Sequence, residues 1–308
     1  MKENDEIYNS NDFLKIWRDV SLIFSEYANQ ISQVDDDIIY HYTDTNGLYG
    51  ITKSKKLWAT SASYLNDRSE YKYGISVFID VIKNIKNVTI NKIRDEVLNE
   101  LNNPEIHKNI LCHDVYVCSF SQKHDMLSQW RGYANEGKGF AIGFDKQQLS
   151  CALKNYKCIY APIVYNDIKK NVYNLISGII SHFGCHFKNN INSENKGIIC
   201  QYLMGIINIL APFIKHPGFS EESEYRIVTF NFDNRLSEYI DVRLVNDTLV
   251  PYIPMNFMNS RNPIRKIIIG PCNNNENVRN SLKRLFNENN QYNKDSVKFV
   301  NSEIPFLP

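Results

Sequence analysis

Two segments far apart in the chain carry side chains suited to polar chemistry. His41 lies in the run IIYHYT. Glu224 opens the run EYRIVTF, and Glu222 lies two residues before it. Both runs are rich in β-branched and aromatic residues, which predicts strands. At strand spacing Glu222 and Glu224 share one face, and so do His41 and Thr43. Such a set can hydrogen-bond a hydroxyl group and stabilise positive charge that develops in a transition state. The structural alternative is a satisfied strand histidine beside an exposed ion pair of Glu224 with Arg226, which would contribute little to stability.

Arg131 is a further candidate, in the segment DMLSQWRGYA, for which we predict a helix. A guanidinium group can bind a diphosphate through two parallel hydrogen bonds. Trp130 and Tyr133 of the same segment are expected to pack in the core.

The histidines and cysteines do not complete a metal site. His182, Cys185 and His186 have the spacing that places zinc-type ligands on one face of a helix. No fourth ligand and no HExxH motif accompanies them, so we expect no metal. The sequence also lacks GxxxxGK[ST], a GxGxxG after a strand and GxSxG, which disfavours nucleoside-triphosphate enzymes and α/β-hydrolases. A Cys–His protease stays open, because its residues need not be close in sequence.

The composition is typical of a globular cytoplasmic protein. The 308 residues are 43% hydrophobic with a net charge of +1, so bulk attraction to nucleic acid or to an anionic membrane is not expected. The seven cysteines include no CxxC pair, which indicates reduced thiols, and the polar start predicts no signal peptide. The longest apolar stretch, residues 198–214, is interrupted by Gln201, Asn208 and Pro212. It predicts a buried helix and no membrane partner.

The order of the predicted elements indicates an α+β fold. Helices are expected at residues 13–31, 45–55 (capped by Asp44), 70–85, 90–101, 125–134, 172–187, 198–214 and 276–286. Strands are expected at residues 38–43, 57–63, 115–121, 138–145, 157–165, 224–230, 239–245, 263–271 and 297–300. Helices and strands do not alternate regularly, which disfavours a doubly wound parallel sheet. We expect a single domain, residues 1–308. It has an N-terminal helical extension (1–34), a core (35–271) with a helical insertion at about 166–215, and a C-terminal helix and strand (272–308).

Several of these segments together resemble the bacterial domain-of-unknown-function 2971 family. In chain order they are YHYTDTNGLYGI (40–51), LWATSASYLND (57–67), VCSFSQKHDMLSQWRGYANEGKGFAIGFD (117–145), SEYRIV (223–228) and IRKIIIGP (264–271). They span most of the chain between residues 40 and 271, and their order and spacing carry the resemblance. The helical stretch 172–214 contributes no such motif.

The first strand, the helix after it and the second strand are also similar, more remotely, to the start of ADP-ribosyltransferases. Those enzymes use a histidine on the first strand, a tyrosine or serine on the second and a glutamate on a later strand. The resemblance implies split antiparallel sheets that bind NAD as a substrate. Cleavage of the nicotinamide–ribose bond builds positive charge on the ribose, as in glycoside cleavage.

On this resemblance the catalytic residues are Glu224 at the ribose 2′-hydroxyl, Glu222 orienting the nucleophile, and His41. The implied NAD-binding residues are His41, Thr43, Ser61, Ser63, Tyr64, which would stack on the nicotinamide ring, and Arg131.

The leading expectation is therefore NAD-dependent ADP-ribosyl transfer, or NAD hydrolysis in the same site, by an intracellular toxin or anti-phage effector. Its acceptor would be a protein or a nucleic acid, and a cognate antitoxin or defence-system protein would be a further partner. One alternative is a non-enzymatic module that binds a nucleotide or a partner. This alternative is distinguished from ADP-ribosyl transfer by whether His41 and Glu224 meet in one pocket, which the transfer reaction requires. The other is a nucleic-acid-processing effector with carboxylates around a metal. Its basic strip would be drawn from Lys53, Lys55, Lys56, Arg261, Arg265 and Lys266.

Overall fold

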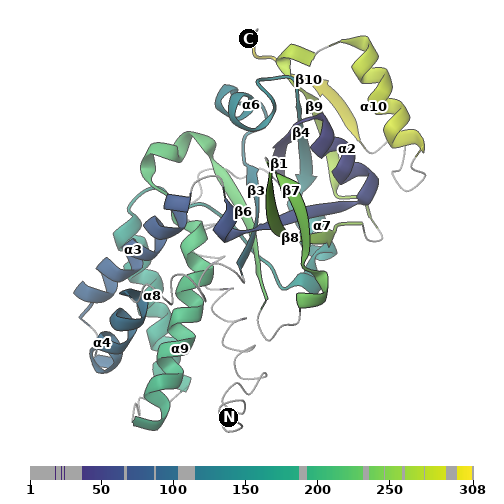
Figure 1. The fold of residues 1–308 in the computed structure, drawn as a ribbon. Helices are drawn as coiled ribbons and strands as arrows, with labels where there is room; N and C mark the ends of the chain where they lie inside the picture. Colours follow the sequence, from purple (N-terminus) through teal and green to yellow (C-terminus); the bar gives the residue numbers. More distant parts are fainter. Residues whose placement is uncertain are drawn as a thin grey trace.

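The protein is a mixed α+β structure built around a ten-stranded, mostly antiparallel sheet (Figure 1). The computed structural model describes residues 18, 22, 24, 37–65, 68–86, 88–102, 115–186, 193–231, 236–245, 247–258, 261–273, 275–288 and 297–306. The strands are β1 Ile38–Thr43, β2 Lys56–Ser61, β3 Val115–Ser121, β4 Phe140–Asp145, β5 Ile159–Pro162, β6 Glu224–Phe230, β7 Asp241–Val245, β8 Thr248–Asn256, β9 Ile264–Ile269 and β10 Lys298–Asn301. Their order is β10-β9-β4-β1-β3-β2-β8-β7, and β6 pairs with both β3 and β5. Only β9 and β10 pair in parallel among these strands.

The sheet forks at β3. The strand β6 pairs with β3 along its whole length, from Val115 to Ser121, and so occupies one edge of β3. The other edge is shared: β1 pairs with it at Ser121, and β2 pairs with it at Tyr116 and Val117. Residues 118–120 lie between these two pairings, at the point where the branch that begins with β1 and the branch that begins with β2 separate.

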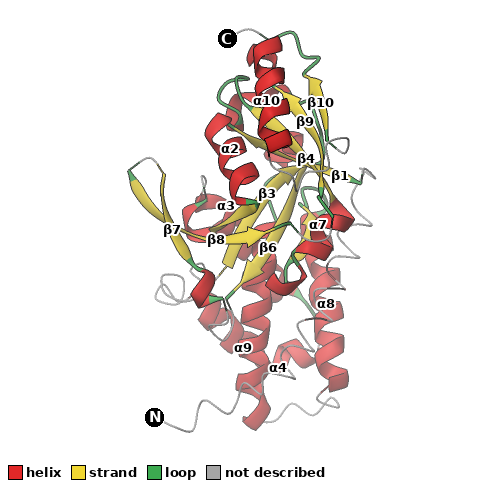
Figure 2. Ribbon diagram, turned by 90° about the vertical axis from the view of Figure 1, so that its right-hand side faces the viewer, coloured by secondary structure: helices red, strands yellow, loops and turns green. Residues whose placement is uncertain are grey.

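Alternation along β3 divides the core between the two faces of the sheet. Val115 and Val117 pack in one hydrophobic cluster, and Tyr116, Cys118 and Phe120 pack in another, as expected for a strand buried on both faces. The first cluster is formed with the helices α3 Arg68–Asn84, α4 Val88–Asn102, α8 Ile168–His186 and α9 Ser193–Leu210. The second cluster is formed with α2 Thr45–Ser54, α7 Lys146–Ala152 and α10 Glu276–Glu288. Figures 1 and 2 show α4, α8 and α9 extending away from the sheet, with α2 and α10 near its other end.

A short helix, α6 Leu127–Tyr133, fixes one wall of the site described below. Trp130 is fully buried and lies edge-on to Tyr42 of β1, with ring centroids 4.9 Å apart. Its indole nitrogen donates to Asp125 at 2.6 Å. The prediction that Trp130 packs in the core is confirmed, whereas Tyr133 is 43% exposed, so the same prediction for Tyr133 is wrong. Tyr133 lies on the other side of α6, from which its ring is directed at the ion cluster.

Most predicted elements are confirmed within one to four residues. The predicted cap of α2 is present, because the Asp44 side chain accepts a hydrogen bond from the Gly47 amide at 2.7 Å. One strand was not predicted: β8 contains Pro251 and Pro254 yet lies between β2 and β7. The predicted strand 57–63 ends at Ser61 and continues as a 3-10 turn, Ala62–Tyr64.

The apolar stretch 198–214 forms most of α9 and the 3-10 turn Ala211–Phe213, and it is buried as predicted. Within the described part of the chain, no helix is long and apolar enough to cross a membrane. The helix predicted at 13–31 falls largely outside the described residues. Of the described ones, Phe24 is buried against Phe213, with ring centroids 4.8 Å apart.

Candidate functional site

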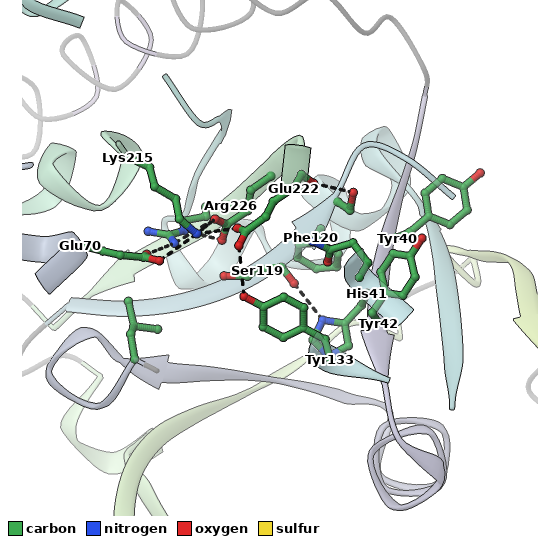
Figure 3. A pocket seen from close by; sticks show the side chains of 14 residues that line it. Tyr40, His41, Tyr42, Glu70, Ser119, Phe120, Tyr133, Lys215, Glu222 and Arg226 are labelled. Atoms are coloured by element: carbon green, nitrogen blue, oxygen red, sulfur yellow. Dashed lines mark hydrogen bonds and ion pairs between the residues drawn. The ribbon is translucent and has the colours of Figure 1, made fainter. Parts of the chain in front are cut away.

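A cavity of about 120 Å³ lies beside the fork of the sheet. Its walls come from β1, β3 and β6, from the start of α3, from α6, and from residues 215–222 before β6. The lining residues are Tyr40, His41, Tyr42, Leu65, Glu70, Ser119, Phe120, Ser121, Gln129, Tyr133, Lys215, Glu222, Glu224 and Arg226 (Figure 3). His41 and both predicted glutamates therefore meet in one cavity, although about 180 residues of sequence separate them.

His41 closes the gap between the two branches of the sheet. Its Nδ1 atom lies 2.9 Å from the carbonyl oxygen of Ser119, on the stretch of β3 that neither β1 nor β2 pairs with. A carbonyl oxygen only accepts, so Nδ1 carries the proton and the neutral ring keeps Nε2 as an acceptor. Burial lowers the pKa of His41, the bond to Ser119 opposes this shift, and the charge of Arg243 adds to it. The imidazole is therefore neutral at neutral pH.

The opposite wall of the cavity is a buried cluster of five charged side chains centred on Lys215. Its Nζ atom lies 2.8 Å from Glu70, 2.5 Å from Glu222 and 3.2 Å from Glu224, and the side chain is only 2% exposed. Burial would lower the pKa of Lys215, but the three carboxylates outweigh it and raise the pKa. The ammonium group thus occupies the point at which the carboxylates converge.

Glu224 is held as a carboxylate by Arg226, two residues along β6. The guanidinium contacts both oxygens of Glu224, at 2.6 and 3.0 Å, and also Glu70 at 2.7 Å. Burial opposes ionisation of Glu224, but Arg226 and Lys215 outweigh it and lower the pKa of that carboxyl. Glu224 and Arg226 are 6% and 3% exposed, so the alternative of an exposed ion pair is wrong. The two side chains are buried because α3 and residues 211–215 cover the beginning of β6.

Glu222 is the more accessible of the two predicted glutamates. It ends the 3-10 turn Pro217–Glu222, so the prediction that it shares a strand face with Glu224 is wrong. The left-handed backbone of Ser223 (φ 44°) separates this turn from β6. One carboxylate oxygen binds Lys215, and the other lies 3.5 Å from the Tyr133 hydroxyl. Burial raises the pKa of Glu222 and the contact with Lys215 opposes this rise. Burial and the Glu222 charge also raise the pKa of Tyr133 to about 12, so its hydroxyl stays a hydrogen-bond donor.

The remaining predicted binding residues do not line this cavity. Thr43 is buried at the end of β1 and Ser61 at the end of β2. Ser63 and Tyr64 lie in the 3-10 turn after β2, next to Leu65, which does line the cavity. The Arg131 side chain is stacked on the ring of Phe306, 4.9 Å from its centroid.

Four important members of the site were not predicted as such: Glu70, Tyr133, Lys215 and Arg226. Each lies in a segment whose element was predicted, but no motif links them. Lys215 had one usable signal, because it is the first charged residue after the apolar stretch 198–214. A lysine at the end of a buried helix requires carboxylate partners.

No metal site emerges in the described part of the chain, where no three side chains of His, Cys, Asp or Glu are grouped to hold an ion. The side chains of His182, Cys185 and His186 lie outside the described residues.

Comparison with known proteins gives one match. Searches of curated proteins and of solved structures found none, so the expected resemblance to ADP-ribosyltransferases has no support from them. Residues 129–227 match the model of a family described as protein of unknown function (DUF2971). This range contains Lys215 and the two glutamates but not His41, and it includes the helices α8 and α9, for which no motif was identified. Between α6 and β6 the chain is therefore similar to the DUF2971 family, as its sequence motifs indicated.

Proposed function

We propose that the cavity cleaves the nicotinamide–ribose bond of NAD and transfers the ADP-ribosyl group to water or to a macromolecule. The observation that carries the proposal is the meeting of a neutral histidine and two carboxylates in one cavity at the fork of the sheet. A volume of about 120 Å³ is well below the roughly 300 Å³ at which sites for whole drug-sized ligands begin. The cavity would thus take the ribose, with the rest of the dinucleotide outside.

The charges of the cluster suit a cationic transition state. Three carboxylates face two cations in it, which leaves one net negative charge when all five groups are ionised. Because ion pairs hold these side chains in place, the side chains need to move little when positive charge develops on the ribose. Glu224, held on both oxygens, supplies fixed charge, whereas Glu222, with one oxygen toward Tyr133, is placed to contact the ribose hydroxyls. The Nε2 atom of His41 accepts a hydrogen bond from a second hydroxyl.

The test is nicotinamide release by the purified protein and its variants. We expect Glu222→Gln, Glu224→Gln and His41→Ala each to lower the rate by about 100-fold or more, the usual effect of losing one transition-state contact. Glu221→Gln is the matched control, because Glu221 is exposed in the same 3-10 turn and does not line the cavity. Circular dichroism would confirm folding, above all for the buried Glu224. Equal rates in all four variants would contradict the proposal.

A second function, a module that binds a nucleotide without cleaving it, also has an observation in its favour. Lys215 and Arg226 already satisfy the carboxylate oxygens of Glu224 and Glu70, so the cluster is complete without a substrate. Under this alternative NAD binds to the wild-type protein and no nicotinamide appears.

A further inference from the structure

Among the described residues, Arg243 has no anionic partner. It lies on β7, where its Nη2 atom donates to the Thr60 hydroxyl at 2.8 Å. Its guanidinium carbon lies 5.1 Å from the ring centroid of Trp58 and 5.4 Å from that of Tyr252. The Nε atom is buried and has no hydrogen-bond partner, and within the described residues Arg243 forms no ion pair. Most of the five donors of this guanidinium are therefore unused.

The surroundings of Arg243 fix its orientation without neutralising it. Two aromatic rings attract a guanidinium through their negatively charged faces. These rings also lie edge to face with each other, with centroids 6.1 Å apart. Burial lowers the pKa of Arg243, yet a guanidinium stays protonated in proteins. A buried N–H without a partner costs stability in the folded protein, and a ligand that accepts from it would remove that cost.

The sheet register places Arg243 on the same side of the sheet as the cavity. Thr60 pairs with Val117 of β3 and with Tyr252 of β8, so these three residues share a face. Ser119, two residues after Val117, lies on that face too and lines the cavity. Arg243 is also close enough to His41 for its charge to contribute, after burial, to the lowered pKa of that imidazole. The guanidinium therefore lies across the fork from the cluster of Lys215.

We propose that Arg243, held by Trp58 and Tyr252, is an anion subsite that binds the phosphate groups of a nucleotide whose ribose lies in the cavity. This assignment rests on the proposed function. A planar guanidinium can give a phosphate two parallel hydrogen bonds. The cavity is too small for a dinucleotide, so a diphosphate attached to the bound ribose must lie outside it. Neither Arg243 nor Arg131 lines the cavity. Arg243 takes this role in place of Arg131 because the Arg131 guanidinium is stacked on Phe306, whereas Arg243 lies beside Thr60, on the face of the sheet that carries Ser119.

Calorimetric titration with ADP-ribose, and with nicotinamide riboside as the phosphate-free probe, tests the subsite. We expect Arg243→Gln to weaken ADP-ribose binding by roughly 10- to 100-fold, the usual effect of losing a charged hydrogen-bond pair, and to leave nicotinamide riboside binding unchanged. Arg243→Lys keeps the charge but loses the planar fork, so its affinity should fall between those of the wild type and Arg243→Gln. Arg131→Gln is the matched control and should bind ADP-ribose like the wild type.

Two results would overturn the subsite. One is a wild-type protein that does not bind ADP-ribose, and the other is an Arg243→Gln variant that binds it with unchanged affinity. If Arg243→Gln lowers the melting temperature but leaves the affinity for ADP-ribose unchanged, Arg243 only stabilises the sheet and the subsite is rejected. This test and the test of the proposed function can fail independently. If ADP-ribose binding depends on Arg243 but no nicotinamide is released, the subsite is retained and the catalytic function is rejected.

Discussion

Lys215 decides whether the charged cluster can stay buried. Its ammonium group contacts three carboxylates, and the side chain is almost completely enclosed. Removing one partner of a buried ion pair leaves uncompensated charge, which is far more costly than removing an exposed partner.

We therefore expect Lys215→Met to lower the free energy of unfolding by about 3–5 kcal/mol, measured by urea denaturation at neutral pH. Lys169→Met is the control, since Lys169 pairs with Asp80 at 2.6 Å while 74% exposed. Its effect should be below about 1 kcal/mol. Equal effects of the two substitutions would show that the cluster is not a buried unit.

The neutral state of His41 predicts a pH dependence of folding. Because burial lowers the pKa of His41 in the folded protein, the unfolded chain binds a proton that the folded protein does not. This difference appears as the pH falls below about 6.5, the ordinary value for histidine. The stability contributed by neutral His41 is complete above that pH and is lost as the pH falls toward the lowered pKa.

Replacement of His41 by a residue that does not titrate should remove this dependence of stability on pH. We expect the melting temperature of the wild type to fall more steeply between pH 7.5 and 5.5 than that of His41→Gln. Parallel curves for the two proteins would mean that His41 titrates in the folded state as it does in the unfolded chain.

At the scale of elements, the contact between α3 and the 3-10 turn Ala211–Phe213 aligns the cluster. Glu70 lies in the first turn of α3, and Pro212 in the 3-10 turn accepts a hydrogen bond from Arg226. Gly74 permits the close approach, since a Cβ atom there would collide with the carbonyl oxygen of Ala211.

Gly74→Ala should therefore destabilise the protein by roughly 1–3 kcal/mol, as overpacking does, although alanine is the better helix former. Gly178→Ala in α8 is the matched control, because its Cβ atom would meet nothing within 4 Å. It should stabilise the protein by about 0.5–1 kcal/mol. Thermal unfolding of both variants measures the difference, and a stabilising Gly74→Ala would contradict the close contact.

Local sequence pattern was sufficient to predict most of the elements, because each is set by its own periodicity and caps. The strand β3 was predicted at its observed bounds, and α2 with its Asp44 cap. The strand β8 was missed because Pro251 and Pro254 argue against an interior strand. Its pairing with β2 and β7 is long-range information that no local window contains.

The same limit applies to the candidate site. His41 and the two glutamates were chosen on the remote resemblance to ADP-ribosyltransferases, and the fold brings them into one cavity. Lys215, Glu70 and Arg243 escaped prediction because a partner in space, and not a motif, gives each its importance. Their partners lie between 7 and 183 residues away along the chain, so the topology had to be known first.

At the scale of the whole molecule, the fork of the sheet joins the features described above. The branch that begins with β1 carries His41, the branch that begins with β2 leads to Arg243, and β6 carries Glu224 on the other edge of β3. A substrate lying along the fork would meet the imidazole of His41 at the gap between the branches, and the guanidinium of Arg243 and the carboxylate of Glu224 on one face of the sheet. This arrangement suits a nucleotide with a ribose at one end and phosphates at the other.

The most direct test of this account is the time course of nicotinamide release from NAD by the wild-type protein, with and without cell extract as a source of acceptor. The account predicts release well above the rate of spontaneous hydrolysis in at least one of the two conditions, and a loss of that release in Glu222→Gln. Release at the spontaneous rate in both conditions, by a folded protein, would contradict the proposed cleavage and leave the cavity as a binding site.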